Sequence, residues 1–192
     1  MPAKPGERKL QILQVLAQML EAPHGEKITT AALAGKLDVS EAALYRHFAS
    51  KAQMFEGLIE FIEETLFRLI NKVASEEPSA VRQIESILTL LLGFAQTNRG
   101  MTRVLIGDAL VHENERLQAR INQLHDRLEA TLKQCLRNAV SQQELPPMLD
   151  ATSKANALIC FVVGRWHQFA KSGFKRLPKE YWALQWPGLL AG

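Results

Sequence analysis

The side chains whose types and spacing could do chemistry cluster between residues 28 and 51. Most of them carry hydroxyl, imidazole or cationic groups: Thr29, Thr30, Ser40, Tyr45, Arg46, His47 and Lys51. Such groups donate hydrogen bonds to phosphate oxygens, and arginine can also bind the edge of guanine. Ala42 and Ala43 lie among them, and their methyl groups can contact the methyl group of thymine. This combination favours binding to double-stranded DNA over catalysis.

Two short helices joined by a tight turn are predicted to position these groups. Thr29 or Thr30 can cap the first helix, because a side-chain oxygen accepts a backbone N–H that would otherwise have no partner. Ser40 can cap the second helix in the same way. Ser50 and Gln53 have the spacing of a capping box at the start of a third helix. The layout is that of a helix-turn-helix, whose second helix lies in the DNA major groove.

Within this motif, Leu44 and Phe48 are spaced to face the core, which leaves the outward positions for recognition. The residues predicted to face the groove are Ala42, Ala43 and Tyr45 or Arg46. Contacts to phosphates position a protein without reading the sequence. The residues predicted to make them are Thr30, Tyr45, His47 and Lys51. For His47, a helix-packing role is the alternative, and the sequence does not decide between the two.

The same segment carries a family resemblance. Its pattern Thr-Thr-x-x-Leu-Ala, followed by Val-Ser-x-x-x-Leu-Tyr-x-His-Phe-x-Ser-Lys, resembles the N-terminal DNA-binding domain of TetR-type regulators. The resemblance implies an all-α fold, with a three-helix helix-turn-helix domain over residues 1–52 and a helical dimerisation and partner domain over residues 53–192. Asp38 departs from the family, which usually has glycine at this turn position. Because aspartate tolerates a positive φ better than most residues, we expect a modest loss of stability and an intact fold.

Apolar residues recur at helical spacing along most of the remaining chain. They predict a first helix that ends near Ala22, a helix over about 51–74, a helix that has Pro78 in its first turn and ends near 97, and a shorter helix that ends near 112. Further helices are predicted over 117–135, 158–171 and 181–186. The alternation typical of strands is not found. The pattern therefore agrees with the all-α class.

Composition limits the classes of function. The net charge is +3, and residues 1–55 hold seven Lys and Arg against five Asp and Glu. This charge permits DNA binding without establishing it. Cys135 and Cys160 lie within apolar helical patterns and are expected to be buried thiols. The N-terminus has no apolar signal core and no apolar run is long enough to span a bilayer, so we expect a cytoplasmic protein.

Motifs for catalysis are missing from the sequence. It has no phosphate-binding glycine loop, no metal-ligand spacing, and no nucleophile set among plausible partners. We therefore expect no enzymatic activity, no cofactor and no metal.

Beyond the helix-turn-helix, the chain resembles the nucleoid occlusion branch of the TetR family. The segments that carry this resemblance are 40–48, 58–63, 90–94, 116–124 and 180–187. The resemblance implies a dimer on chromosomal DNA that contacts the tubulin-like division protein FtsZ and blocks septum assembly over the nucleoid. It places FtsZ in a groove between the fourth and fifth helices, and the matching positions are Phe61, Leu90, Gly93 and Asn98.

Two positions depart from that resemblance. Leu69 and Thr97 stand where arginine is expected. Arg68 and Arg99 lie nearby and are the candidates to replace the missing charges.

Gly93 has two competing explanations. A glycine inside a helix costs about 1 kcal/mol relative to alanine and usually has a reason. One reason is the close approach of another chain, as at a partner surface. The other is close packing of a helix from the same chain, which physical considerations alone slightly favour.

Aromatic residues are concentrated towards the C-terminus. The resemblance to TetR-type proteins implies that the last two helices pair across a two-fold axis, and the residues assigned to this contact are Phe161, Trp166, Phe169 and Trp182. Part of this aromatic area must also serve the core of the protomer. A symmetric dimer reads two half-sites, so the expected DNA site is palindromic, with one dimer or more bound to each site.

A ligand-controlled repressor is the alternative function. In that case the second domain would hold a small apolar molecule among its helices, with His112, His125, Arg103 and Asp108 as the available polar groups. The cluster of Lys171, Lys175, Arg176 and Lys179 is predicted to be a solvated loop, with a contact to a membrane or to the DNA backbone as the alternative.

Overall fold

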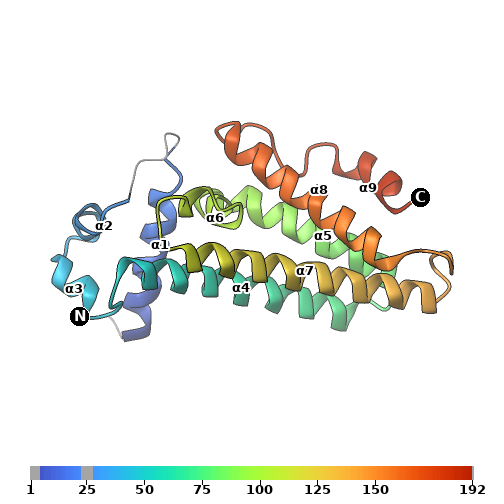
Figure 1. The fold of residues 1–192 in the computed structure, drawn as a ribbon, viewed down its shortest axis with the longest axis horizontal. Helices are drawn as coiled ribbons and strands as arrows, with labels where there is room; N and C mark the ends of the chain where they lie inside the picture. Colours follow the sequence, from blue (N-terminus) through green and yellow to red (C-terminus); the bar gives the residue numbers. More distant parts are fainter. Residues whose placement is uncertain (1–4, 23–27, 192) are drawn as a thin grey trace. The chain divides into compact units, whose positions relative to one another are not determined.

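A computed structural model of the chain describes residues 5–22 and 28–191, and all regular structure in these ranges is helical. The helices are α1 (Pro5–Met19), α2 (Thr30–Lys36), α3 (Glu41–Tyr45), α4 (Lys51–Glu76), α5 (Ala80–Thr97), α6 (Arg99–Leu105), the 3-10 helix η1 (Asp108–Leu110), α7 (Glu115–Ser141), α8 (Ala151–Lys171) and α9 (Trp182–Leu190). Figure 1 shows their order along the chain. The all-α prediction is confirmed.

The chain divides into two compact units, each made of two separate stretches of the sequence. The first unit takes the N-terminal segment to Ile62, together with Arg99–Ile121. The second takes Glu63–Asn98 and Asn122–Gly192. Both α4 and α7 cross from one unit to the other, so the boundary runs through continuous helices rather than through a linker.

In the first unit, α6 packs against α1 at a position that only glycine allows. A Cβ added to Gly100 would lie 1.9 Å from the carbonyl oxygen of Ala17. A second connection comes from Arg103, whose Nη1 donates hydrogen bonds to the carbonyl oxygens of Leu20 at 3.3 Å and Ala22 at 2.8 Å. These carbonyls follow the end of α1. Arg103 therefore satisfies backbone acceptors that the helix itself leaves open.

In the second unit, α5 packs against α8, and the two are drawn side by side in Figure 1. The indole of Trp166 is fully buried between them and donates a hydrogen bond to the carbonyl oxygen of Leu91 at 3.0 Å. Trp182 on α9 donates its indole N–H to Thr89 Oγ1 at 2.8 Å. A buried indole normally needs such an acceptor. These two bonds connect α8 and α9 to α5.

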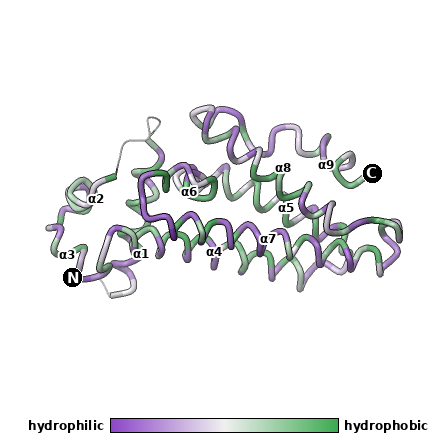
Figure 2. Tube along the Cα trace, in the orientation of Figure 1, coloured by the Kyte–Doolittle hydropathy of each residue, from purple (hydrophilic) through white to green (hydrophobic). Residues whose placement is uncertain are grey.

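Hydrophobic residues at helical spacing form the cores of both units. Figure 2 shows hydrophobic and hydrophilic residues alternating along α7. The apolar residues predicted for this helix are all buried: Leu117, Ile121, Leu124, Leu128, Leu132 and Cys135. Across the described ranges, no helix combines the length and the apolar character needed to cross a membrane.

Several local expectations were wrong. Cys160 is exposed rather than buried, because it lies on the face of α8 turned away from the core. Pro78 precedes α5 instead of occupying its first turn, and Ser79 is the cap. The helix expected to reach residue 112 ends at Leu105, where Gly107 takes a left-handed conformation with φ 76° before η1.

Candidate nucleic-acid interface

Local hydrogen bonds build the helix-turn-helix as the sequence predicts. Thr29 caps α2, since its Oγ1 accepts the backbone N–H of Ala32 at 3.1 Å. Ser40 caps α3, since its Oγ accepts the N–H of Ala43 at 3.3 Å. Between them, Asp38 adopts the left-handed conformation expected of a turn residue, with φ 52°. Thr29 and Ser40 therefore act on the motif through its backbone.

The start of α4 differs slightly from the predicted capping box. Ser50 Oγ accepts the N–H of Gln53 at 3.2 Å, as expected. The side chain of Gln53 accepts the N–H of Ala49 at 2.9 Å rather than that of Ser50 itself. The reciprocal bond is thus present but is displaced by one residue, which still fixes the chain as it enters α4.

The predicted division between core and outward residues in α3 is confirmed for its apolar side chains. Leu44 and Phe48 are buried. The outward side chains are Ala42 and Arg46, which are exposed, and Tyr45, which is 44% exposed. Ala43 and His47 are half-buried. Of the residues predicted to face the groove, Ala42, Tyr45 and Arg46 are therefore more accessible than Ala43.

A hydroxyl and carboxylate network joins α2 to α3. Thr30 Oγ1 donates a hydrogen bond to Glu41 Oε2 at 2.5 Å, and the hydroxyl of Tyr45 lies 3.5 Å from Thr30 Oγ1 as a donor. Glu41 lies in the first turn of α3, and its contact with Thr30 had no signal in the sequence. The network fixes both hydroxyl groups on one surface of the motif. A phosphate contact by Thr30 would have to replace Glu41 as its acceptor.

Lys51 is likewise occupied within the first unit. Its Nζ forms an ion pair with Glu113 Oε1 and lies 5.7 Å from the centre of the Phe55 ring. Both charged groups are largely buried. The sequence offered no signal for this pair, because Glu113 is far away in the chain. Lys51 therefore links the start of α4 to the segment after η1, and a phosphate would have to compete with this ion pair.

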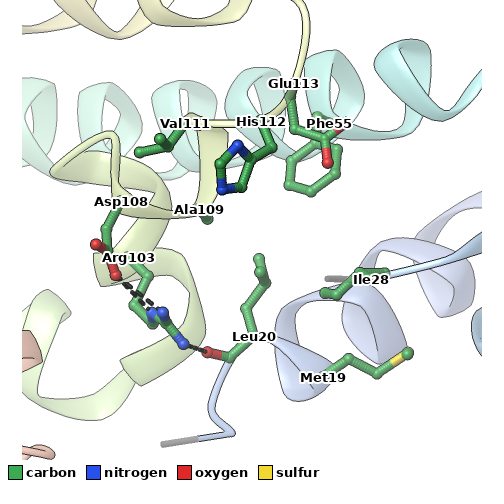
Figure 3. Close-up of a pocket in the computed structure, with 10 residues that line it drawn as sticks. All are labelled: Met19, Leu20, Ile28, Phe55, Arg103, Asp108, Ala109, Val111, His112 and Glu113. Carbon is green, nitrogen blue, oxygen red and sulfur yellow. Dashed lines mark hydrogen bonds and ion pairs between the residues drawn. The ribbon is translucent and has the colours of Figure 1, made fainter. Parts of the chain in front are cut away.

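A small pocket in the first unit brings together three of the polar residues considered for a ligand site. Arg103, Asp108 and His112 line it, as Figure 3 shows, whereas His125 belongs to the other unit. The guanidinium of Arg103 is already bound to Asp108, with Nε 3.0 Å from Oδ2. The pocket volume is about 50 Å³, which has room for a few water molecules. It is too small for a drug-sized or lipid-like effector.

The residues assigned to partner binding all lie partly at the surface. Phe61 on α4, and Leu90 and Gly93 on α5, are half-buried. Asn98 caps the end of α5, where its Nδ2 donates to the carbonyl oxygen of Phe94 at 2.8 Å. Among the described residues, a Cβ added to Gly93 would have the Lys179 side chain as its one contact within 4 Å, at 3.8 Å. The explanation of Gly93 by close packing of another helix is therefore wrong for this chain.

The aromatic residues assigned to dimerisation belong mainly to the core of the second unit. Trp166 and Phe169 are fully buried within the protomer. Phe161 is half-buried and its ring lies 6.0 Å from that of Trp182. Direct contact with a second chain would therefore come from outward residues of the same helices, such as Leu184, which is 82% exposed. The buried aromatic rings pack beneath those outward residues within the protomer and hold them in position.

Comparisons with known proteins agree with this arrangement. Residues 24–58 match the family described as bacterial regulatory proteins of the tetR family, and residues 78–191 match the SlmA-like tetracyclin repressor-like C-terminal domain. The nucleoid occlusion factor SlmA of Marinomonas sp. is 53% identical over 97% of this chain and 94% of its own length. SlmA of Alteromonas mediterranea is 54% identical over 97% of this chain and 96% of its own length.

The chain belongs to the SlmA family of nucleoid occlusion factors. As a member of this TetR-type family it is a dimeric DNA-binding regulator. The SlmA match extends through the second unit, which favours nucleoid occlusion over the alternative of a ligand-controlled repressor.

Solved structures show the same fold at much lower identity. The fatty acid degradation regulator FadR of Bacillus halodurans aligns with a TM-score of 0.81 at 15% identity, over 100% of this chain and 98% of its own. The TetR regulator PfmR of Thermus thermophilus aligns with a TM-score of 0.78 at 21% identity, over 95% and 98%. At these identities the likeness concerns the fold alone.

Proposed function

We propose that this SlmA-family protein is a cytoplasmic, nucleoid-associated dimer that binds palindromic chromosomal sites and there contacts FtsZ, so that the division septum does not assemble over the nucleoid. One dimer or more occupies each site. The proposal extends the family membership with a defined DNA surface and a defined partner surface.

On the DNA side, the accessible face of α3 supports the proposed roles. Ala42 and Tyr45 face away from the core, and Arg46 is exposed and able to bind guanine or a phosphate. Ala43 and His47 complete this face as half-buried residues. Thr30 and Lys51 act as phosphate contacts once DNA displaces Glu41 and Glu113 from them. The exchange keeps each donor satisfied, because a phosphate oxygen replaces a carboxylate oxygen.

On the partner side, Gly93 carries the proposal. A glycine inside a helix lowers its stability, yet among the described residues an added Cβ at Gly93 would meet just the stem of Lys179 within 4 Å. A surface without Cβ allows another chain to approach the backbone of α5 closely. Leu90 and Asn98 flank Gly93 on α5, and the family resemblance adds Phe61 of α4 to the partner residues. FtsZ is the occupant that the family membership suggests for such a surface.

The test is a fluorescence anisotropy titration on the DNA-bound protein. A palindromic site is first selected by the protein from a random duplex pool, and the complex is titrated with a labelled peptide of the FtsZ C-terminal tail. We expect saturable binding that Phe61→Ala weakens by at least tenfold, because a lost aromatic anchor costs about 2 kcal/mol or more at an interface.

Phe67→Ala is the matched control, since Phe67 is a half-buried phenylalanine of the same helix whose ring is covered by the guanidinium of Arg127, at 4.1 Å. It should leave tail affinity unchanged. Tight DNA binding without any tail binding by the parent protein would overturn the FtsZ proposal and favour a ligand-controlled repressor.

A further inference from the structure

The connection between α8 and α9, residues 172–181, is a rigidly braced loop rather than a loose one. The guanidinium of Arg165 donates hydrogen bonds to the carbonyl oxygens of Leu177 at 2.9 Å, Pro178 at 3.0 Å and Glu180 at 2.6 Å. The ring of Phe174 is buried against Phe169, with the ring centres 5.1 Å apart. One buried aromatic anchor and one arginine therefore hold the whole backbone of this loop in place.

The braced loop presents positive charge on the surface. Lys175, Arg176 and Lys179 are exposed, and Glu180 is the single acidic residue between positions 171 and 181. The N–H groups of Lys175 and Arg176 are fixed by the hydroxyl oxygen of Ser172, at 3.1 and 2.9 Å. A rigid base reduces the entropy lost when these cations meet an anion. The sequence predicted a solvated loop here, with a contact to a membrane or to the DNA backbone as the alternative.

A depression of about 360 Å³ separates this loop from the end of α5. Its lining combines two cations, one carboxylate, an amide and an apolar side chain: Lys175, Lys179, Glu180, Gln96 and Leu177. Leu177 is 43% exposed and offers an apolar floor. Gln96 contributes a further feature, because its Oε1 atom is buried and has no hydrogen-bond partner in the described part of the chain. An unsatisfied buried acceptor costs about 1–3 kcal/mol, which a suitable donor would recover.

The depression adjoins the surface at Gly93. The Cδ atom of Lys179 lies 3.8 Å from the position that a Cβ of Gly93 would occupy, and Gln96 follows Gly93 within one helical turn. A chain that crosses α5 at Gly93 therefore reaches Lys179 and the pocket without leaving the surface of the second unit.

We propose that this pocket is a second anchor for the partner, and that it holds an acidic peptide segment next to the part that crosses Gly93. Carboxylates of the segment pair with Lys175 and Lys179. A backbone N–H of the segment donates to Gln96 Oε1 after the amide turns towards the pocket, and an apolar side chain covers Leu177. The inference rests on the proposed function, because it assumes that a partner lies across Gly93.

The chemistry favours a peptide over the DNA backbone. A phosphodiester carries negative charge but has no N–H or O–H donor, so it would leave Gln96 Oε1 unsatisfied. It would also gain nothing from an exposed leucine. An acidic peptide supplies all three groups that the pocket requires: an anion, a donor and apolar surface.

The experiment measures the affinity of the DNA-bound protein for the peptide of the FtsZ C-terminal tail at low and at high salt. The double variant Lys175→Glu and Lys179→Glu should raise the Kd for the FtsZ tail by about tenfold at low salt and by much less at high salt, because exposed charge pairs are screened. Gln96→Leu removes the acceptor and should weaken binding about threefold at both salt concentrations. The charge-matched control is Lys72→Glu with Arg137→Glu, two exposed cations of the same unit outside the pocket lining, and it should match the parent protein.

The outcomes separate the two proposals. If the parent protein binds the FtsZ tail and the double variant binds it equally well at low salt, the proposed role of the pocket is wrong and the FtsZ proposal stands. No tail binding by the parent would overturn both. If the double variant loses affinity for duplex DNA but keeps its affinity for the tail, the pocket binds phosphates, and the peptide inference is wrong. Circular dichroism of each variant checks that the helices are intact.

Discussion

Gly93 and Gly100 are close in the sequence, yet the structure uses them in opposite ways. At Gly100 the absence of a Cβ lets α6 lie directly against the backbone of α1, with Ala17 O in the space a methyl group would need. At Gly93 the absence of a Cβ leaves an open surface on α5, where, among the described residues, a lysine stem is the nearest contact. At Gly100 the glycine thus allows a close approach within the protomer, and at Gly93 it allows the approach of a partner chain that we propose.

The two glycines differ most in how strongly an added methyl group would change the stability of the protein. Gly100→Ala would place a methyl group 1.9 Å from a backbone oxygen, and backbone atoms cannot move aside cheaply. We expect the free energy of unfolding to fall by about 3 kcal/mol. Chemical denaturation monitored by circular dichroism measures this change. A variant as stable as the parent would mean that α6 does not pack against α1 as described.

The contact between α6 and α1 also has a polar part, and its loss should lower the free energy of unfolding by less. Arg103→Ala removes the donor for the carbonyls of Leu20 and Ala22 and leaves Asp108 without its cation. Because these groups are largely buried, we expect a loss of about 2 kcal/mol in the free energy of unfolding.

Arg116→Ala is the matched control for Arg103→Ala, since it breaks an exposed ion pair with Glu56 in the same unit. It should change the stability by less than about 0.5 kcal/mol. Equal effects of the two substitutions would show that Arg103 contributes only as a surface charge.

Gly93→Ala tests the other side of the comparison and should raise stability. The added Cβ has an ordinary van der Waals contact at 3.8 Å, so the helix propensity of alanine should add up to about 1 kcal/mol to the free energy of unfolding. The affinity for the FtsZ tail should nevertheless fall, because the new methyl group occupies the space of the partner. Denaturation and the anisotropy titration measure the two effects independently. A more stable variant with unchanged tail affinity would remove Gly93 from the partner surface.

Features that depend on neighbouring residues in the sequence could be predicted. The caps at Thr29 and Ser40 and the left-handed turn at Asp38 involve atoms a few residues apart, so local chemistry decides them. The outward positions of α3 follow in the same way from helical spacing, with Leu44 and Phe48 inside.

Features that depend on which helices pack together could not be predicted. The ion pair of Lys51 with Glu113 joins residues far apart in the chain, and no pattern marks it. The exposure of Cys160 depends on which face of α8 meets α5, and the sequence pattern alone left both cysteines in apolar surroundings. The same limit explains why the sequence left two explanations of Gly93 open.

The smallest predicted effect concerns the opposite end of α5 from Gly93. Glu144 Oε2 accepts the N–H of Val81 at 2.8 Å, and this bond, with help from Ser79, holds the pKa of Glu144 below its usual value. A carboxyl group whose pKa is lowered on folding contributes stability at pH values above its unfolded pKa. That contribution is lost as the pH falls through the lowered pKa. Because Glu144 is fully exposed, solvent screening keeps the effect small.

Glu144→Gln should therefore lower the melting temperature slightly at neutral pH and not at all in acid. Glutamine retains an oxygen for the Val81 N–H but lacks the charge that interacts with the start of the helix. Thermal melts of parent and variant between neutral and acidic pH measure the difference. A gap in melting temperature that stays constant as the carboxyl group protonates would show that the bond to Val81 gains nothing from charge. The bond to Val81 would then act as a neutral hydrogen bond, like those by which Gln142 and Ser79 accept the N–H groups of Ala80 and Arg82.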